Sequence, residues 1–70
     1  MKRSFVEIEE SIIGLLKNAA RSNWELSSAL NIDPLTLRKR TKRLEERGAI
    51  QKHHHLWHWI PPEKREIPND

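Results

Sequence analysis

The most restrictive feature of this 70-residue chain is the short interval between two of its predicted helices. Asn31 ends the first helix, because asparagine tolerates the left-handed conformation in which many helices terminate. Asp33 and Pro34 begin the second, since Asp is a favoured N-cap and Pro is favoured at the first helical position. Helices joined by so few residues cannot lie antiparallel, so we expect these two to cross at a steep angle.

Capping patterns mark the other helix boundaries. Ser4 with Glu7, and Ser22 with Glu25, are pairs three residues apart that match the capping box at a helix start. Gly48 matches the glycine that commonly follows a helix C-terminus. The sequence therefore predicts helices over residues 4–20, 23–30 and 34–47.

Apolar residues recur along these segments with the spacing of one helical face, which predicts a shared core. Over residues 34–47, the inward stripe at about 3.6 residues per turn consists of Leu37, Thr41 and Leu44. Phe5 extends the stripe of the first helix, and Ala29 lies on the apolar side of the second. The full predicted core comprises Leu26, Leu30, Leu37 and Leu44 with Ile8, Ile12, Leu15 and Leu16.

A hairpin around three consecutive histidines is predicted from two strand-like runs, residues 49–52 and 56–60. A two-residue loop would place Ile50 opposite Trp57 or Trp59, whereas a three-residue loop would place it opposite His58. We favour the two-residue loop, because it sets large apolar side chains beside each other. We expect Trp59 to pack and Trp57 to be partly exposed.

The length of the chain predicts one domain, because 70 residues suffice for a single modest core. Pro61 and Pro62 are expected to end the second strand. We assign residues 1–62 to this domain and residues 63–70 to a polar C-terminal tail.

Positive charge is concentrated in one segment of the chain, although the net charge is only +3. Residues 1–33 carry four Lys or Arg against five Asp or Glu, whereas residues 34–47 carry six against two. Such a basic stripe is typical of a polyanion binder, although taken alone a charge run is more often a solvated helix face.

The segment over residues 22–50 resembles the winged helix-turn-helix family, and is similar to the leucine-responsive and multiple-antibiotic-resistance regulators. The matching residues read SNWELSSALNIDPLTL over 22–37 and RLEERGAI over 43–50. The chain departs from the family pattern at Asn31, commonly Gly, and at Thr41, commonly a larger aliphatic residue. The resemblance implies a mainly α fold of three helices with a C-terminal two-stranded β-hairpin wing. It also implies that residues 34–47 form the recognition helix and that the wing lies along the adjacent backbone or minor groove.

The outward face of the helix over 34–47 supplies the candidate DNA contacts, because cations on a helix in the major groove can reach phosphates and base edges. Arg43 is a candidate for a bidentate contact with guanine, and Arg38 lies on the flank of this face. Leu35 could meet a thymine methyl group or a protein partner, or be a singly exposed apolar residue. The predicted DNA-binding residues are Leu35, Thr36, Arg38, Lys39, Lys42 and Arg43 in the helix, and Lys52, His53, His54, His55 and Trp57 in the wing.

Trp57 is included because residues 48–52, followed by Leu56 and Trp57, are similar to the wing of the Z-form nucleic-acid-binding domains, where a Trp helps to grip the backbone. Arg38 and Lys42 stand where that family has Asn and Tyr, and the Pro pair before Leu56 is missing. We therefore do not expect specificity for Z-form nucleic acid.

The residue inventory argues against other classes of function. There is no Cys and there are only two Gly, so neither a thiolate zinc site nor a glycine-rich phosphate loop is expected. His53 and His55 would share one face of an extended segment and His54 and His58 the other, so at most two imidazoles converge. We expect no metal, no cofactor and no enzymatic activity, since no nucleophile stands with a recognisable base.

No segment is apolar for long enough to cross a membrane, and we expect a cytoplasmic protein, nucleoid-associated if its source is prokaryotic or viral. The predicted function is double-stranded DNA binding by a small transcriptional regulator. The alternatives are a winged-helix protein–protein adaptor and a non-specific architectural DNA binder. A single small module buries little surface on DNA, so we also consider a homodimer or a larger assembly.

Overall fold

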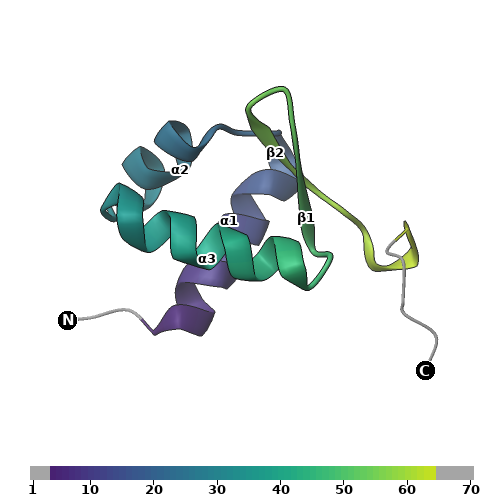
Figure 1. The fold of residues 1–70 in the computed structure, drawn as a ribbon, viewed down its shortest axis with the longest axis horizontal. Helices are drawn as coiled ribbons and strands as arrows, with labels where there is room; N and C mark the ends of the chain where they lie inside the picture. The colour runs from purple at the N-terminus through teal and green to yellow at the C-terminus, as the bar shows by residue number, and fades with distance from the viewer. Residues whose placement is uncertain (1–3, 65–70) are drawn as a thin grey trace.

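The computed structural model describes residues 4–64, which form three helices, a two-stranded antiparallel sheet and a short 3-10 helix (Figure 1). The elements are α1 (Phe5–Asn18), α2 (Asn23–Leu30), α3 (Pro34–Glu46), β1 (Ile50–His53), β2 (Leu56–Trp59) and η1 (Pro62–Lys64). This is the mainly helical fold with a C-terminal hairpin that the sequence predicts. Most of the predicted tail, residues 65–70, lies outside the described residues.

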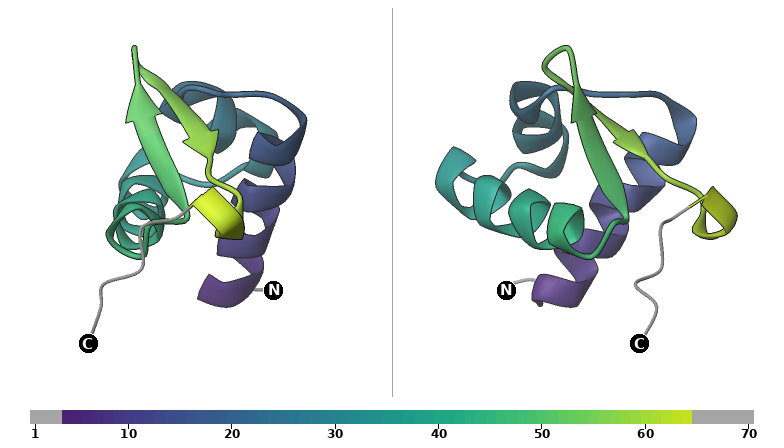
Figure 2. Two further views of the ribbon diagram at one scale, coloured as in Figure 1. Left: turned by 90° about the vertical axis from the view of Figure 1, so that its right-hand side faces the viewer. Right: turned by 45° about the vertical axis from the view of Figure 1, so that its right-hand side comes forward.

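The helices cross one another, and the hairpin stands beside the C-terminal half of α3. In Figure 1, α3 passes in front of α1, and α2 lies near the start of α3. Figure 2 shows the turn of the hairpin projecting away from the start of α1. This arrangement leaves one side of α3 facing the hairpin and the other side facing α1.

Each helix begins at its predicted N-cap. The Ser4 Oγ accepts a hydrogen bond from the backbone N–H of Glu7 at 3.1 Å. Ser22 and Glu25 form the full reciprocal capping box at the start of α2. Asn31 ends α2 at φ 54° and ψ 49°, which confirms the predicted left-handed residue.

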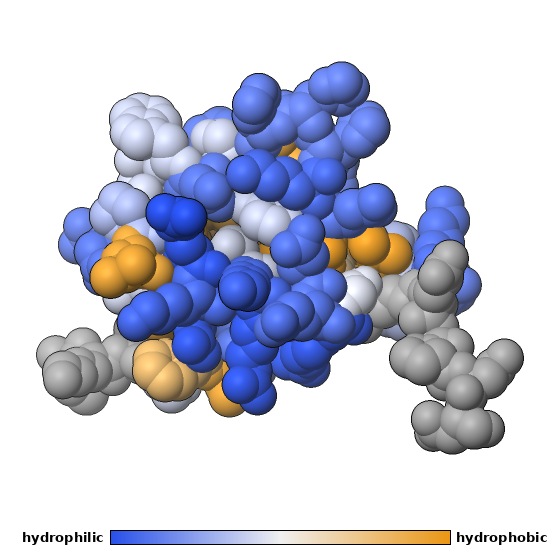
Figure 3. All heavy atoms as spheres, in the orientation of Figure 1, coloured by the Kyte–Doolittle hydropathy of each residue, from blue (hydrophilic) through white to orange (hydrophobic). Residues whose placement is uncertain are grey.

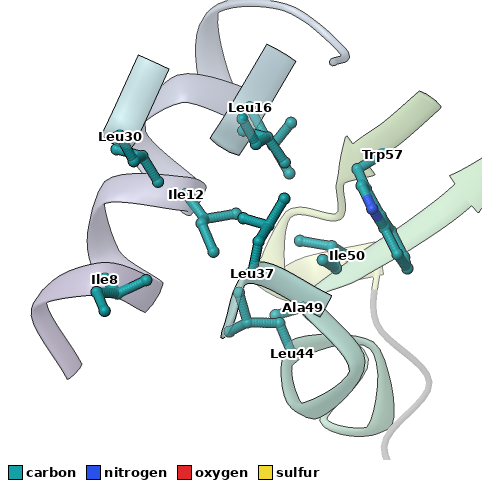
Figure 4. Packing of buried hydrophobic residues seen from close by; sticks show 10 residues of the cluster. Ile8, Ile12, Leu16, Leu30, Leu37, Leu44, Ala49, Ile50 and Trp57 are labelled. Carbon is teal, nitrogen blue, oxygen red and sulfur yellow. The ribbon is translucent and has the colours of Figure 1, made fainter. Parts of the chain in front are cut away.

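The buried apolar residues form one cluster to which all three helices and both strands contribute. Figure 4 shows Leu37 between the side chains of α1 and those of the hairpin. Burying this cluster removes apolar surface from water, which is the main stabilising contribution in a domain of this size. The cluster contains Ile8, Ile12, Leu16, Leu26, Leu30, Leu37, Leu44, Ala49, Ile50 and Trp57.

Three residues assigned to apolar stripes are less buried than predicted. Leu15 is half-buried and packs against the edge of the core. Ala29 is exposed. Phe5 is 61% exposed, because it lies in the first turn of α1, where its ring meets the Arg40 guanidinium at 4.0 Å rather than the apolar cluster.

The hairpin has the two-residue loop favoured from the sequence. Ile50 pairs with Trp59, so the loop consists of His54 and His55. Their φ angles are 52° and 68°, and positive φ at both central residues is the requirement of a type I′ hairpin turn. Asn and Gly usually meet this requirement, and two histidines meet it here.

The prediction that Trp57 is partly exposed is wrong, because this side chain is only 5% exposed. The backbone of Trp57 forms an isolated antiparallel bridge with Arg21 on the side of β2 that faces away from β1. Its Nε1 donates a hydrogen bond to the Asn23 Oδ1 at 2.6 Å. These contacts hold the indole in the core, whereas Trp59 near the open end of the hairpin is half-buried.

Candidate nucleic-acid interface

An open hollow of about 460 Å³ lies between α3 and the hairpin. Four cations line it, three of them on α3 and one on β1. In the orientation of Figure 3, hydrophilic side chains cover most of the face formed by α3 and the hairpin. The lining consists of Asn23, Leu35, Arg38, Lys39, Thr41, Lys42, Glu45, Lys52 and Trp57.

The side of α3 that borders the hollow is set by helical spacing. Arg38, Lys39 and Lys42 follow Leu35 at intervals of three, four and seven residues, and so share one face. All four side chains are exposed. The sequence placed Arg38 on the flank of the outward face. In the structure the hairpin lies on that flank, so Arg38 lines the hollow together with Lys39 and Lys42.

Lys52 brings the hairpin's charge to the same hollow. It pairs with Trp57 across the hairpin, and its Nζ lies 5.7 Å from the centroid of the Trp57 ring. Trp57 is tied to α2 through Asn23 and to residue 21 through two backbone hydrogen bonds of 3.2 and 2.7 Å. Lys52 therefore lies on β1, and the strand paired with it, β2, is anchored to the start of α2.

The side of α3 that faces α1 carries two arginines, and the C-cap residue adds a third; together they surround one carboxylate. Glu9 on α1 is only 7% exposed. Its oxygens accept hydrogen bonds from the Arg40 Nη1 at 3.4 Å and from the Arg47 Nη1 at 3.3 Å. The Arg43 Nε lies 3.8 Å from the Glu9 Oε2. The positive charge of α3 is thus divided between the hollow and this cluster.

Arg43 and Thr36, which the sequence placed on the outward face, do not line the hollow. The Arg43 side chain is 65% exposed but is directed toward α1 by Glu9. The Thr36 Oγ1 donates to the Asp33 Oδ1 at 2.6 Å, so this hydroxyl completes the helix cap. Both side chains therefore contact an acidic residue, and both lie beside the face of α3 that borders the hollow.

Two carboxylates that cap helices, Glu25 at the start of α2 and Asp33 at the start of α3, have pKa values below their ordinary values. The Thr36 hydroxyl and backbone N–H both donate to Asp33 and hold its pKa below its ordinary value. Hydrogen bonds from the Ser22 backbone and side chain likewise lower the pKa of Glu25. The ionised Asp33 fixes the start of α3 next to the hollow.

The histidines are distributed over the two faces of the hairpin differently from the prediction, which placed His53 with His55 and His54 with His58. His53 and His58 share one face of the hairpin with Gln51, with ring centroids 6.2 Å apart, because the chain reverses at His54 and His55. Alternation along β1 puts this face opposite the one that carries Lys52. Among residues 4–64, no three His, Asp or Glu side chains gather as a metal site, and no helix is long and apolar enough to cross a bilayer.

Comparison with known proteins decides the family of this chain. Residues 7–51, more than half of its length, match the family model for winged helix-turn-helix DNA-binding domains. The chain belongs to this family. The match does not single out the leucine-responsive or multiple-antibiotic-resistance regulators. No curated protein and no solved structure gives a significant match.

The matched segment of the winged helix-turn-helix domain runs from the first turns of α1 into β1. It includes the α3 side of the cationic hollow, while Lys52 and Trp57 lie just beyond it. This is a DNA-binding domain, and among residues 4–64 the hollow gathers four exposed cations that form no ion pair with Glu9.

Sequence reasoning missed two residues that build this winged helix-turn-helix interface. Asn23 follows a capping residue, and nothing near it indicates a hydrogen bond to a residue 34 positions later. Glu9 interrupts the apolar stripe of α1, and its partners lie 31 and 38 positions away. The spacing of Arg40, Arg43 and Arg47 places them on one side of the helix, but it does not indicate what faces them.

Proposed function

We propose that this domain is a small transcriptional regulator that reads double-stranded DNA, with α3 in the major groove and the hairpin on the flanking backbone. The observation that carries this proposal is the convergence of Arg38, Lys39 and Lys42 from α3 with Lys52 from β1 on one hollow. A helix of this size fits the major groove, and cations on its two sides reach phosphates of both strands.

The roles of the side chains follow from their positions. Leu35 and Lys39 lie toward the N-terminal half of α3, which in helix-turn-helix docking lies nearest the base edges. Arg38 and Lys42 are placed between that face and the hairpin, where phosphates are within reach. We assign to Trp57 the positioning of the wing, because its indole is buried beside the base of Lys52.

The remaining candidates occupy the edges of the proposed interface. Thr36 and Arg43 lie at the margin of α3 and would meet the backbone there. His53, His54 and His55 lie at the exposed end of the hairpin, close to phosphates in this docking.

The size of the interface bears on how the protein assembles. A single recognition helix and one short hairpin bury less surface on DNA than a dimeric regulator does. We propose that tight binding requires a homodimer on two half-sites, or a larger protein assembly. The family is defined by binding DNA rather than by catalysis, and binding alone is the activity that we propose.

The test is binding to duplexes selected from a random DNA pool, measured by fluorescence anisotropy over a series of salt concentrations. Replacing Arg38, Lys39 or Lys42 by Ala should weaken binding, and each lost phosphate contact should reduce the log–log salt slope by about 0.9. Arg47→Ala is the matched control, because Arg47 is an exposed cation of the same region that faces Glu9.

The same variants separate the alternatives. A sequence reader loses its preference at one base position when a base-contacting residue is replaced. If Arg43 contacts guanine, as expected from the sequence, Arg43→Ala relaxes the preference at one position, whereas a backbone contact at the margin of α3 makes Arg43→Ala weaken binding to all duplexes equally. An architectural binder loses affinity equally for all duplexes. If none of the α3 variants changes DNA affinity at low salt, α3 is not the DNA-binding element, and a protein adaptor becomes the better description.

A further inference from the structure

Leu35 is an apolar side chain in a hollow that is otherwise lined mainly by polar and charged groups. Its side chain is 62% exposed. Three other large hydrophobic residues of the described chain are exposed to a similar or greater extent: Phe5, Val6 and Trp24. None of those three lines the hollow. A single exposed leucine needs no explanation by itself, so its position within the hollow is what carries the inference.

That position is fixed by the start of α3. Asp33 accepts hydrogen bonds from the Thr36 N–H at 2.9 Å and from the Thr36 hydroxyl at 2.6 Å. Pro34 occupies the first helical position, and Leu35 is the second residue of the helix. The N-terminal turn of a recognition helix is the part that comes closest to base edges. Leu35 is therefore held where a base-reading side chain is expected.

The chemistry of leucine limits what it can recognise there. Its side chain neither donates nor accepts a hydrogen bond, and the one apolar group on the major-groove edge of a base pair is the C5-methyl of thymine. Arg38, Lys39 and Lys42 on the same face disfavour an apolar protein partner and favour a polyanion.

We propose that Leu35 determines part of the target sequence by packing against the methyl group of a thymine. This inference rests on the proposed function, since it requires α3 to lie in the major groove. It adds a specificity that phosphate contacts cannot supply, because contacts between cations and phosphates carry no direct sequence information.

The test replaces each thymine of a selected duplex in turn by uracil, which removes the methyl group and leaves the base-pairing edge unchanged. Burial of one methyl group corresponds to about a fourfold change in affinity. We expect a loss of about this size at one thymine per half-site, and no loss at the others. The readout is the dissociation constant from fluorescence anisotropy at fixed salt.

Two protein variants connect this effect to Leu35. Leu35→Ala should bind the thymine and uracil duplexes equally while remaining folded, as checked by circular dichroism melting. Val6→Ala is the matched control, because Val6 is also 62% exposed but lies on α1, and it should keep the fourfold difference.

The inference is overturned if the wild-type protein binds its selected duplex and no single uracil weakens binding, or if the difference persists in Leu35→Ala. Either result leaves the proposed function intact. Absence of any selected duplex in the random-pool experiment rejects sequence reading itself, and the inference with it.

Discussion

Single side chains determine whether the core and the wing of this domain form together. Trp57 joins the apolar cluster and also donates a hydrogen bond to Asn23, so its burial depends on a residue in α2. Its exposure could not be predicted from the sequence, because Trp57 and Trp59 share one face of β2 and only the contacts with Asn23 and Arg21 distinguish them. Leu44, by contrast, was predictable, because helical spacing alone places it inward.

Leu44→Ala should lower the free energy of unfolding by about 2 to 5 kcal/mol, because the Leu44 side chain is 1% exposed and its truncation leaves a cavity. This is a large part of the stability of so small a domain. Chemical denaturation measures the loss. The control is Leu35→Ala, which removes the same atoms from an exposed position and should change stability by less than about 0.5 kcal/mol. A similarly small change for Leu44→Ala would contradict the register of α3.

The helix boundaries and the strand pairing of this chain could be predicted from its sequence, whereas the conformation of the hairpin turn could not. The helix boundaries were predictable, because a cap involves residues three or four apart, as in Ser22 with Glu25 or Asp33 with Thr36. The strand pairing was predictable because only one loop length places Ile50 beside a large apolar partner. The conformation of the turn was not, since the loop lacks the Asn, Asp or Gly that marks a type I′ turn.

The cap of α3 should make stability depend on pH in acid. Hydrogen bonds from Thr36 hold the pKa of Asp33 below its ordinary value of 3.8. The stabilisation is therefore complete above that value and is lost as the pH falls through the lower, native pKa. Asp33→Asn removes this titration, so its melting temperature should approach that of the wild type as the pH is lowered from 7 toward 2. A constant difference between the two proteins across this range would show that the cap does not depend on the charge.

Replacing a histidine of the hairpin turn by glycine should stabilise the domain. His55 has a φ of 68°, a conformation that glycine adopts without the steric cost borne by other residues. The left-handed conformation costs a residue with a side chain about 1 to 2 kcal/mol, and the flexibility of glycine in the unfolded chain offsets about 0.5 to 1 kcal/mol of that gain. His55→Gly should therefore raise the free energy of unfolding by about 0.5 to 1 kcal/mol. His53→Gly is the matched control, since residue 53 lies in β1, where glycine is destabilising. Loss of stability in both variants would show that the turn does not hold this conformation.

Across the whole molecule, the division of charge on α3 determines which surface faces DNA. The concentration of cations over residues 34–47 was evident in the sequence, as was the family to which the fold belongs. Which cations pair with a carboxylate and which border the hollow was not evident, because Glu9 and the hairpin contact different sides of α3 and both are distant from it in sequence. A helix contains no local signal that distinguishes a cation paired with a buried acid from one that faces a hollow.

The most direct test of DNA binding through this hollow is a titration of isotope-labelled protein with its selected duplex, followed by the NMR shifts of the backbone amides. The largest shifts should fall in the first two turns of α3 and in residues 52–55 of the hairpin, with little change in the first turns of α1. Shifts concentrated in α1, around the exposed Phe5 and Val6, with α3 and the hairpin unchanged, would contradict the proposed interface.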